Sequence, residues 1–469
     1  MLRGALLVCF VSGLLAGQYA VAGDLGGPSG TESASATAPL DVAVAAPAEE
    51  ATGNDDQMSL SLARLAQLEQ ELGNGGAEHT SAVTAGWDKK RGFFIRDEDD
   101  HFLLRLGGRV QVRHTYNARD ERGDSGSRDS DSSYFELERV RLAFRGHILD
   151  PRLIYQIQVD GDTDRGGSVT TLDAYARYEI FEDILKLGAG QWKAHFLRQE
   201  KTSSGRLQMV DRSLATEYFN VDRGVGAWIE GDLIGDLLFY AVSVTNGFRS
   251  SNRGAASDQR PAVLAKIDLN ILGDYGYSES DIATSEDPNW VVGISGATDR
   301  NEGDGTIVAP DYRVHTAGVD TGFKWLGFSL QAEYMMRWLD YQPTATATDP
   351  DIVAGRSIFS HGFYAQGGYM VWPETIEITA RISTVYGNEG ANDGAATEVG
   401  PGINWFINGH RLKLQTDVMY YDISANAPRP TTNLERSGPD APPSPSFTAL
   451  GLREGEEGIL WRTQLQLVF

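Results

Sequence analysis

The sequence predicts an all-β protein: a transmembrane antiparallel β-barrel of about 16 strands, preceded by a short helical or coiled-coil segment. Three observations support this class. Segments with apolar side chains at every second position recur along the chain, as in strands with one apolar and one polar face. Short turns alternate with long polar loops, which is the pattern of an outer-membrane barrel. The chain also ends on such a strand, whose last residue is the aromatic Phe469.

The terminal segment, residues 458–469, shows the alternation most clearly. Its outward positions are Ile459, Trp461, Thr463, Leu465, Leu467 and Phe469. Its polar positions are Arg462, Gln464 and Gln466. One side would meet lipid and the other water, so we interpret this segment as the closing strand of the barrel.

The first 91 residues are predicted to lie outside the barrel. Residues 1–22 have the basic start, apolar run and Ala-Val-Ala cleavage site of a secretory signal. Residues 23–56 are rich in Ala, Gly, Ser, Thr and Pro, which predicts a disordered linker. Residues 57–72 have apolar side chains at helical spacing, which predicts a short helix or coiled coil, with a frayed helix as the alternative. A linker over residues 73–91 and the barrel over residues 92–469 follow.

Composition narrows the classes of function. The only cysteine, Cys9, lies in the predicted signal, so the mature chain would have no disulfide and no thiolate metal site. A formal net charge of -24 argues against nucleic acid as a partner. No cluster of histidines or other ligands stands out, so we expect no metal, no cofactor and no enzymatic activity. Arginine outnumbers lysine 33 to 8, which favours bidentate recognition of oxyanions or close pairing with carboxylates.

The alternating segments number about sixteen, an even count as bacterial barrels require. Clear examples cover residues 102–113, 139–148, 152–160, 326–338, 376–386 and 412–420. Short turns are expected at residues 149–151, 181–183, 372–374 and 408–410. Long loops are expected at residues 117–134, 193–221, 246–260, 340–360 and 422–457. One connection, residues 270–289, is long where the alternation predicts a short turn.

Six arginines lie on the polar face of two neighbouring predicted strands. They are Arg105, Arg109 and Arg113 on one strand and Arg139, Arg141 and Arg145 on the next. Residues four apart on a strand lie ~13 Å apart, so these side chains would form a column along the lumen. Several sites of moderate strength would let an anion enter and move on. The alternative is a neutralised wall, with the arginines facing lumen acids such as Asp160, Asp173, Glu230 and Glu333.

The long loop that begins near residue 193 is a candidate constriction. Loops at this position in barrels can fold inward and narrow the lumen. Its polar side chains are Lys193, Arg198, Lys201, Ser203 and Ser204. The three cations would add positive charge at the narrowest zone, and the two hydroxyls could donate hydrogen bonds. A solvated surface loop is the alternative.

Several short stretches together resemble the phosphate-selective outer-membrane porin family. They are residues 106–111 (LGGRVQ), 135–142 (FELERVRL), Gly146, 172–175 (LDAY), 190–193 (GQWK) and 462–469 (RTQLQLVF). Their order and spacing carry the resemblance, which extends from about residue 92 to the C-terminus. It implies a sixteen-stranded, usually trimeric barrel with inward-folded loops and an arginine-rich lumen that passes phosphate or similar anions. Glu138 stands where the family typically has a second consecutive arginine, so fold and porin class carry over better than phosphate specificity.

The sequence therefore predicts a porin in the outer membrane of a Gram-negative-type bacterium, with outer-membrane lipid and two further copies of the chain as partners. Small inorganic anions, phosphate first, would diffuse through its arginine-lined lumen. A general or mixed-selectivity porin is the alternative within this class. A barrel with a structural, adhesive or hydrolytic role is the alternative outside it.

Overall fold

A computed structural model describes residues 82–88, 92–121, 131–161, 168–248, 260–301, 312–341, 357–387, 394–424, 427 and 455–469. All of them belong to one compact unit, residues 80–469. The predicted signal, the first linker and the predicted helix of residues 57–72 lie outside the described residues. No helix in the described ranges is long and apolar enough to cross a membrane.

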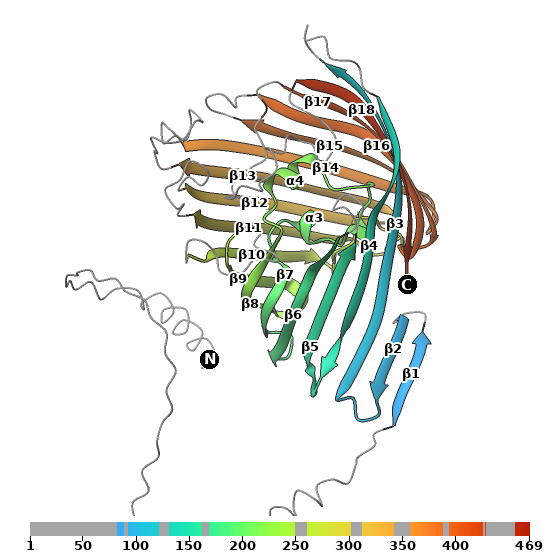
Figure 1. The fold of residues 1–469 in the computed structure, drawn as a ribbon, viewed down its shortest axis with the longest axis vertical. Coiled ribbons are helices and arrows are strands. Elements are labelled where there is room, and N and C mark those ends of the chain that lie inside the picture. The colour runs from blue at the N-terminus through green and yellow to red at the C-terminus, as the bar shows by residue number, and fades with distance from the viewer. Residues whose placement is uncertain are drawn as a thin grey trace, which may run out of the picture. The chain divides into compact units, whose positions relative to one another are not determined.

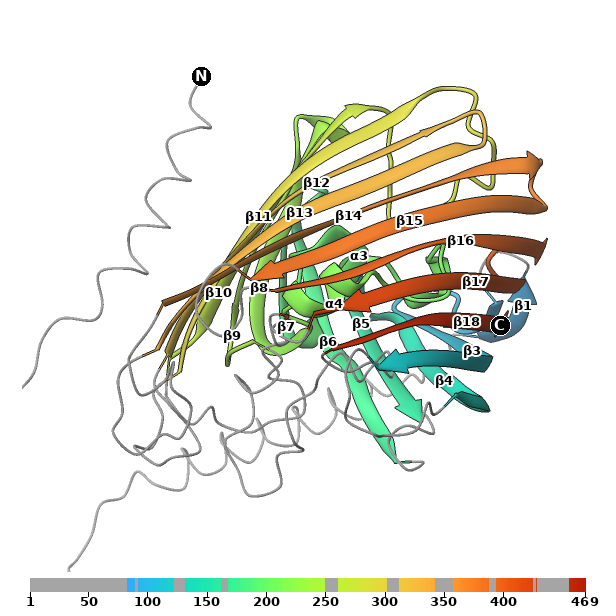
Figure 2. The same cartoon turned by 90° about the horizontal axis from the view of Figure 1, so that it is seen from above.

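Antiparallel strands dominate the structure (Figures 1 and 2). The strands are β1 (Val83–Asp88), β2 (Gly92–Asp97), β3 (Phe102–Glu121), β4 (Ser132–Ile148), β5 (Asp150–Gly161), β6 (Val169–Phe181), β7 (Leu185–Lys193), β8 (Arg223–Leu233), β9 (Leu238–Thr245), β10 (Ala262–Leu272), β11 (Asn289–Asn301), β12 (Tyr312–Trp325), β13 (Phe328–Tyr341), β14 (Ser357–Trp372), β15 (Ile376–Gly387), β16 (Ala395–Asn408), β17 (Leu412–Ile423) and β18 (Glu456–Val468).

The strands β3 to β18 form a closed ring of 16, which confirms the predicted fold class. Each strand pairs with its neighbours in the chain, and β18 pairs with β3 from Glu456↔Glu121 to Val468↔Arg109. Closure gives every strand of the ring a partner on both sides, as a spanning sheet in lipid requires.

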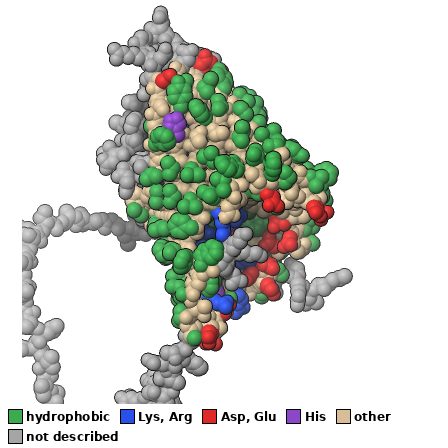
Figure 3. All heavy atoms as spheres, turned by 90° about the vertical axis from the view of Figure 1, so that its right-hand side faces the viewer, with side chains coloured by type: hydrophobic (Ala, Val, Ile, Leu, Met, Phe, Trp, Pro, Cys, Tyr) green, Lys and Arg blue, Asp and Glu red, His purple; other side chains and the backbone are tan. Residues whose placement is uncertain are grey.

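The two faces of β18 are as predicted. Arg462, Gln464 and Gln466 are buried on the lumen side, whereas Trp461 and Leu465 are about half exposed on the outside. The same alternation holds around the barrel and gives it an apolar outer surface (Figure 3). Phe469 continues this surface, and its ring covers Gly108, where a Cβ atom would lie 2.2 Å from the ring.

The predicted linker of residues 73–91 needs correction at its end. Within it, β1 pairs with β2 from Val83↔Asp97 to Asp88↔Gly92, and β2 pairs with the first part of β3. The hairpin therefore extends the sheet at the edge of β3 that β18 leaves open (Figure 1). The apolar residues Val83, Ala85 and Trp87 stand at every second position, which indicates a strand. The prediction of a linker did not use this pattern.

The connections alternate in length around the ring. At one end, here called the short-turn end, tight turns join β4 to β5, β6 to β7 and β14 to β15, each with a non-glycine residue at positive φ. The other end, the long-loop end, has the long connections. The exception predicted from the sequence is present: residues 273–288 form a long connection at the short-turn end.

The connection between β7 and β8, residues 194–222, folds into the barrel and is called the inner loop (Figure 2). It contains α3 (Arg198–Lys201), the 3-10 turn η1 (Ser204–Arg206) and α4 (Leu214–Phe219). Phe196, Leu197, Leu214 and Phe219 are buried in an apolar cluster with lumen-side residues of the barrel wall. Burial of these side chains favours the inward position of the loop.

Close strand packing predicts a stability effect at one glycine. In Gly146→Ala the new Cβ would lie 1.6 Å from the backbone oxygen of Leu103, so β3 and β4 would have to separate. We expect this variant to lose roughly 1–3 kcal/mol of folding free energy. Urea unfolding in lipid vesicles, followed by tryptophan fluorescence, measures the loss. Gly296→Ala is the matched control because no atom lies within 4 Å of its Cβ position. Equal stability of the two variants would contradict the packing argument.

Candidate functional site

Side chains of the barrel wall hold the backbone of the inner loop. The carboxylate of Glu333 accepts hydrogen bonds from the backbone N–H groups of Arg198 (3.0 Å) and Gln199 (2.6 Å). Asp417 accepts from Val210 N–H, and Glu398 accepts from Leu214 N–H. A loop away from any strand ladder needs such partners for its buried amides. These carboxylates therefore set the position of the loop in the lumen.

Arg198 is the most deeply buried cation of the inner loop. Its side chain is 2% exposed and forms ion pairs with Asp268 (2.8 Å) and Asp320 (2.5 Å). The rings of Tyr275 and Tyr277 lie 5.6 and 5.5 Å from its guanidinium carbon. Arg198 was predicted to act in the constriction, and the structure places it as an anchor with both carboxylates already bound.

The six predicted arginines of β3 and β4 lie side by side on the lumen face. Arg105 is opposite Arg145, and Arg109 is opposite Arg141. Arg139 is opposite Gln111, next to a register shift. Like charges directly opposite each other destabilise a sheet, so each pair needs a carboxylate or water nearby. Carboxylates of the described residues meet this need at one end of the column and not at the other.

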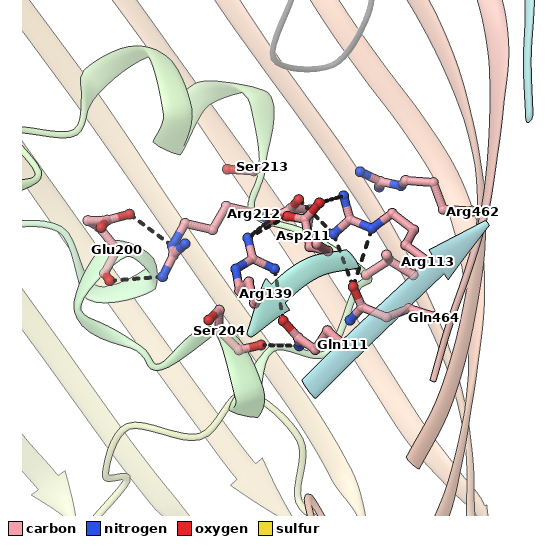
Figure 4. Close-up of polar contacts among 12 residues, drawn as sticks. Gln111, Arg113, Arg139, Glu200, Ser204, Asp211, Arg212, Ser213, Arg462 and Gln464 are labelled. Atoms are coloured by element: carbon pink, nitrogen blue, oxygen red, sulfur yellow. Dashed lines mark hydrogen bonds and ion pairs between the residues drawn. The ribbon is translucent and has the colours of Figure 1, made fainter. Parts of the chain in front are cut away.

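Toward the long-loop end, carboxylates neutralise the arginines (Figure 4). Arg113 and Arg139 both contact Asp211 of the inner loop, at 3.0 and 3.3 Å, and both contact Glu138, at 3.0 and 2.9 Å. Burial of Asp211 acts to raise its pKa, but Arg139 and Arg113 outweigh this and hold the pKa well below its usual range. This part of the column therefore corresponds to the alternative interpretation of the sequence, a wall in which carboxylates neutralise the arginines.

The middle of the column contacts two serines of the inner loop. Arg109 donates to Ser204 Oγ (2.7 Å) and to Ser203 Oγ (2.8 Å). Arg141 donates to Ser204 Oγ (3.1 Å) and is paired with Asp160 at 2.9 Å. Arg109 has hydroxyl partners but no carboxylate partner among the described residues.

Toward the short-turn end, arginines and the terminal residue Phe469 line a cavity of about 530 Å³. Among the described residues, none of these five guanidinium groups has an ion-pair partner. They belong to Arg105, Arg109, Arg145, Arg206 and Arg411. Arg141 also lines the cavity, and no aspartate or glutamate side chain does. We call this space the arginine cavity.

A second cavity of about 350 Å³ shares Arg109, Arg141 and Arg145 with the arginine cavity. Its further cationic residues are Arg177, Lys193, Lys201 and Arg223. Its two acids, Asp173 and Glu230, are paired with Arg223 and Arg177 respectively. The two spaces together follow the wall of β3 to β8, beside the inner loop.

The lysines predicted for the constriction lie beside this second cavity. Lys193 is paired with Glu200 at 3.0 Å, and Lys201 donates to the backbone oxygen of Lys193 at 2.9 Å. Burial lowers the pKa of Lys201 to about 8, although Glu230 and Asp173 act in the opposite direction. Lys201 therefore loses its charge more readily than an exposed lysine.

Four of the cavity-lining cations were missed in the sequence. Arg177 and Arg223 lie on strands, and the alternation could have found them. Arg206 lies in the inner loop, and Arg411 lies in the turn between β16 and β17. No strand periodicity applies at these last two positions, so only the three-dimensional fold brings them to the arginine cavity.

One group of metal-ligand type lies at the short-turn end, where Asp97, Asp99 and His101 place ligand atoms within 4.8 Å of one another. The carboxylate of Asp97 already accepts the backbone N–H groups of His101 and Phe102. The group is therefore explained as the closure of the turn between β2 and β3.

Comparison with solved structures supports the fold. The anion-selective porin from Comamonas acidovorans gives a TM-score of 0.55 at 11% sequence identity, covering 78% of this chain and 99% of that chain. OmpF of Salmonella typhi in complex with daunomycin gives a TM-score of 0.50 at 12% identity, covering 79% of this chain and 99% of that chain. At these identities the likeness shows the fold alone. No curated protein matches the chain.

The sequence model of the phosphate-selective porins O and P matches residues 106–266, from β3 to β10. This range includes most of the arginine column, the inner loop and all the stretches on which the resemblance was first based except residues 462–469. The predicted resemblance is therefore confirmed: over residues 106–266 the chain matches the phosphate-selective porin family.

Proposed function

We propose that the protein is an outer-membrane porin through which small anions diffuse, with phosphate and related oxyanions favoured. The observation that carries the proposal is the arginine cavity, where five guanidinium groups without carboxylate partners face a space that no acidic side chain lines. Uncompensated positive charge lowers the energy of an anion in the lumen and raises that of a cation. The anion-selective porin from Comamonas acidovorans shares the fold and fits this proposal.

The net charge of -24 does not conflict with anion passage. A permeating ion responds to the charges that line its narrow path, since water and salt screen distant charges beyond a Debye length of about 8 Å at physiological ionic strength. The acids of the lumen are largely paired with arginines or bound to inner-loop amides. Asp160, Asp173 and Glu230 pair with arginines, and Glu333 binds backbone amides.

The path would run from the long-loop end, outside the cell, to the short-turn end in the periplasm. An anion would meet Lys201 and Arg223 in the smaller cavity, pass Arg109 and its two serines, and reach the arginine cavity. Guanidinium forks match phosphate geometry, and the serine hydroxyls, which accept from arginines here, can donate their own hydrogens to an anion. Export by the predicted signal and assembly as a homotrimer belong to the same proposal.

Reversal potential in a planar bilayer tests the function. With a tenfold potassium chloride gradient, we expect the wild-type channel to reverse near the chloride equilibrium potential. Phosphate added at low millimolar concentration is expected to reduce the chloride current, because it would occupy the arginine sites longer. A channel that reverses near the potassium potential would refute anion selectivity, and an absence of phosphate block would leave a general anion porin.

Arg145 is the arginine best suited to a substitution test. It lines both cavities, and it forms no ion pair with any described residue, so Arg145→Ala should fold normally. We expect the anion-to-cation permeability ratio to fall by roughly twofold or more, because one uncompensated charge is lost from the path. Arg152→Ala removes the same charge from a rim residue that is paired with Asp150. An equal shift in both variants would show that the cavity has no special role.

Lys201 predicts a pH dependence between pH 7 and 9. Its pKa of about 8 means that the ammonium group is mostly charged at pH 7 and mostly neutral at pH 9. We therefore expect the anion permeability ratio to fall as the pH rises through this range. Lys201→Arg keeps its charge at pH 9, so this variant should lose the pH dependence. Titration curves of the reversal potential that coincide for wild type and Lys201→Arg would assign the dependence to another group.

A further inference from the structure

The unexpectedly long connection at the short-turn end, residues 273–288, is here called the inner turn. Instead of remaining at the rim it enters the lumen, and Tyr275, Glu279, Ser280 and Asp281 are all buried. It contacts the inner loop, because the backbone N–H of Glu279 donates to the backbone oxygen of Arg206. At the same end, the turn between β12 and β13 reverses the chain with two residues. The greater length and the inward position of residues 273–288 therefore need another explanation.

Glu279 is the main contact between the inner turn and the inner loop. Its carboxylate accepts from the backbone N–H of Gln208 (2.7 Å) and from the side-chain amide of Gln199 (3.1 Å). It also accepts from the amide of Gln366 on β14 (2.8 Å). Its own backbone N–H donates to the oxygen of Arg206 (3.3 Å). Buried hydrogen bonds to a charged acceptor are among the stronger ones in proteins.

The two inner-loop residues bound by the Glu279 side chain flank the segment that lines the cavities. Ser203, Ser204 and Arg206 lie between Gln199 and Gln208. The two serine hydroxyls accept hydrogen bonds from the Arg109 guanidinium, and Arg206 lines the arginine cavity. Both ends of this segment are thus fixed by one carboxylate that comes from the opposite rim of the barrel.

Neighbouring contacts reinforce this arrangement. Ser280 donates to Glu377 (2.8 Å), and Glu377 accepts from the side-chain amide of Gln208 (2.6 Å). Tyr277 lines the smaller cavity and lies against Arg198, which is part of the same inner loop. The inner turn therefore contacts the loop at several points and borders the open path itself.

We propose that the inner turn sets the width and the selectivity of the path, with Glu279 as the positioning residue for the inner-loop segment 199–208. Glu279 does not line either cavity, so it acts through Ser203, Ser204 and Arg206. This inference rests on the proposed channel function but concerns the geometry of the constriction, whichever ion the channel prefers.

The test compares Glu279→Gln with Glu286→Gln in planar bilayers. A glutamine at position 279 offers one acceptor oxygen to three donors, and its own amide group faces other donors. We expect the segment 199–208 to loosen, with a rise in single-channel conductance of about 1.5-fold or more, noisier open-channel current and a lower ion selectivity. Glu286 is an exposed residue of the same turn, so its variant has the same charge change and should behave as wild type.

Glu279→Asp separates geometry from charge. It retains the carboxylate but shortens its reach, so a rise in conductance in both position-279 variants assigns the effect to loop position. Heat-modifiable migration on gels identifies the folded fraction, and only folded channels are compared. Folded Glu279→Gln channels with the conductance, noise and selectivity of Glu286→Gln channels would overturn the inference. A cation-selective wild type would refute the proposed function and still leave this comparison valid.

Discussion

Closure of the sheet by β18 and β3 is the constraint on which the rest of the structure depends. In a bilayer every backbone N–H and C=O must find a partner within the protein, and the pairing of these two strands completes that requirement. Once the ring is closed, each strand residue faces either lipid or lumen. Closure therefore separates the apolar side chains, which face lipid, from the polar side chains, which face the lumen. It also brings Gln464 beside Arg113 and Gln466 beside Gln111 of β3.

Charge balance then divides the lumen into two regions. The inner loop supplies Asp211 to the long-loop part of the arginine column, where Glu138 already contributes a second carboxylate. Nearer the short-turn end, the loop supplies the hydroxyls of Ser203 and Ser204 to Arg109. The same loop thus neutralises one part of the column and leaves the other part charged. A wall neutralised throughout would be a more stable arrangement, so the uncompensated arginines are best explained by function.

The sequence predicted what depends on strand periodicity and missed what depends on irregular backbone. The lumen position of Arg105, Arg109 and Arg145 follows from alternation and was predicted. The register shift between Gln111 and Val112 brings Glu138 into contact with Arg113 and Arg139, which alternation alone cannot show. The pairing of Arg113 with Asp211 joins residues 98 positions apart and needs the folded inner loop. The length of the connection 273–288 was noted, but its inward direction depends on partners on other strands.

The inner loop and the inner turn reach the lumen from opposite ends, and this arrangement explains how a charged constriction can be rigid. The arginines of the path repel one another, and the inner loop contacts them through Asp211, Ser203 and Ser204. The backbone of the loop is also held by hydrogen bonds to Glu333, Glu398 and Asp417 of the barrel wall and to Glu279 of the inner turn. These carboxylates bind backbone amides rather than the arginines of the path. Negative charge is thereby used for positioning without cancelling the positive charge that an anion would meet.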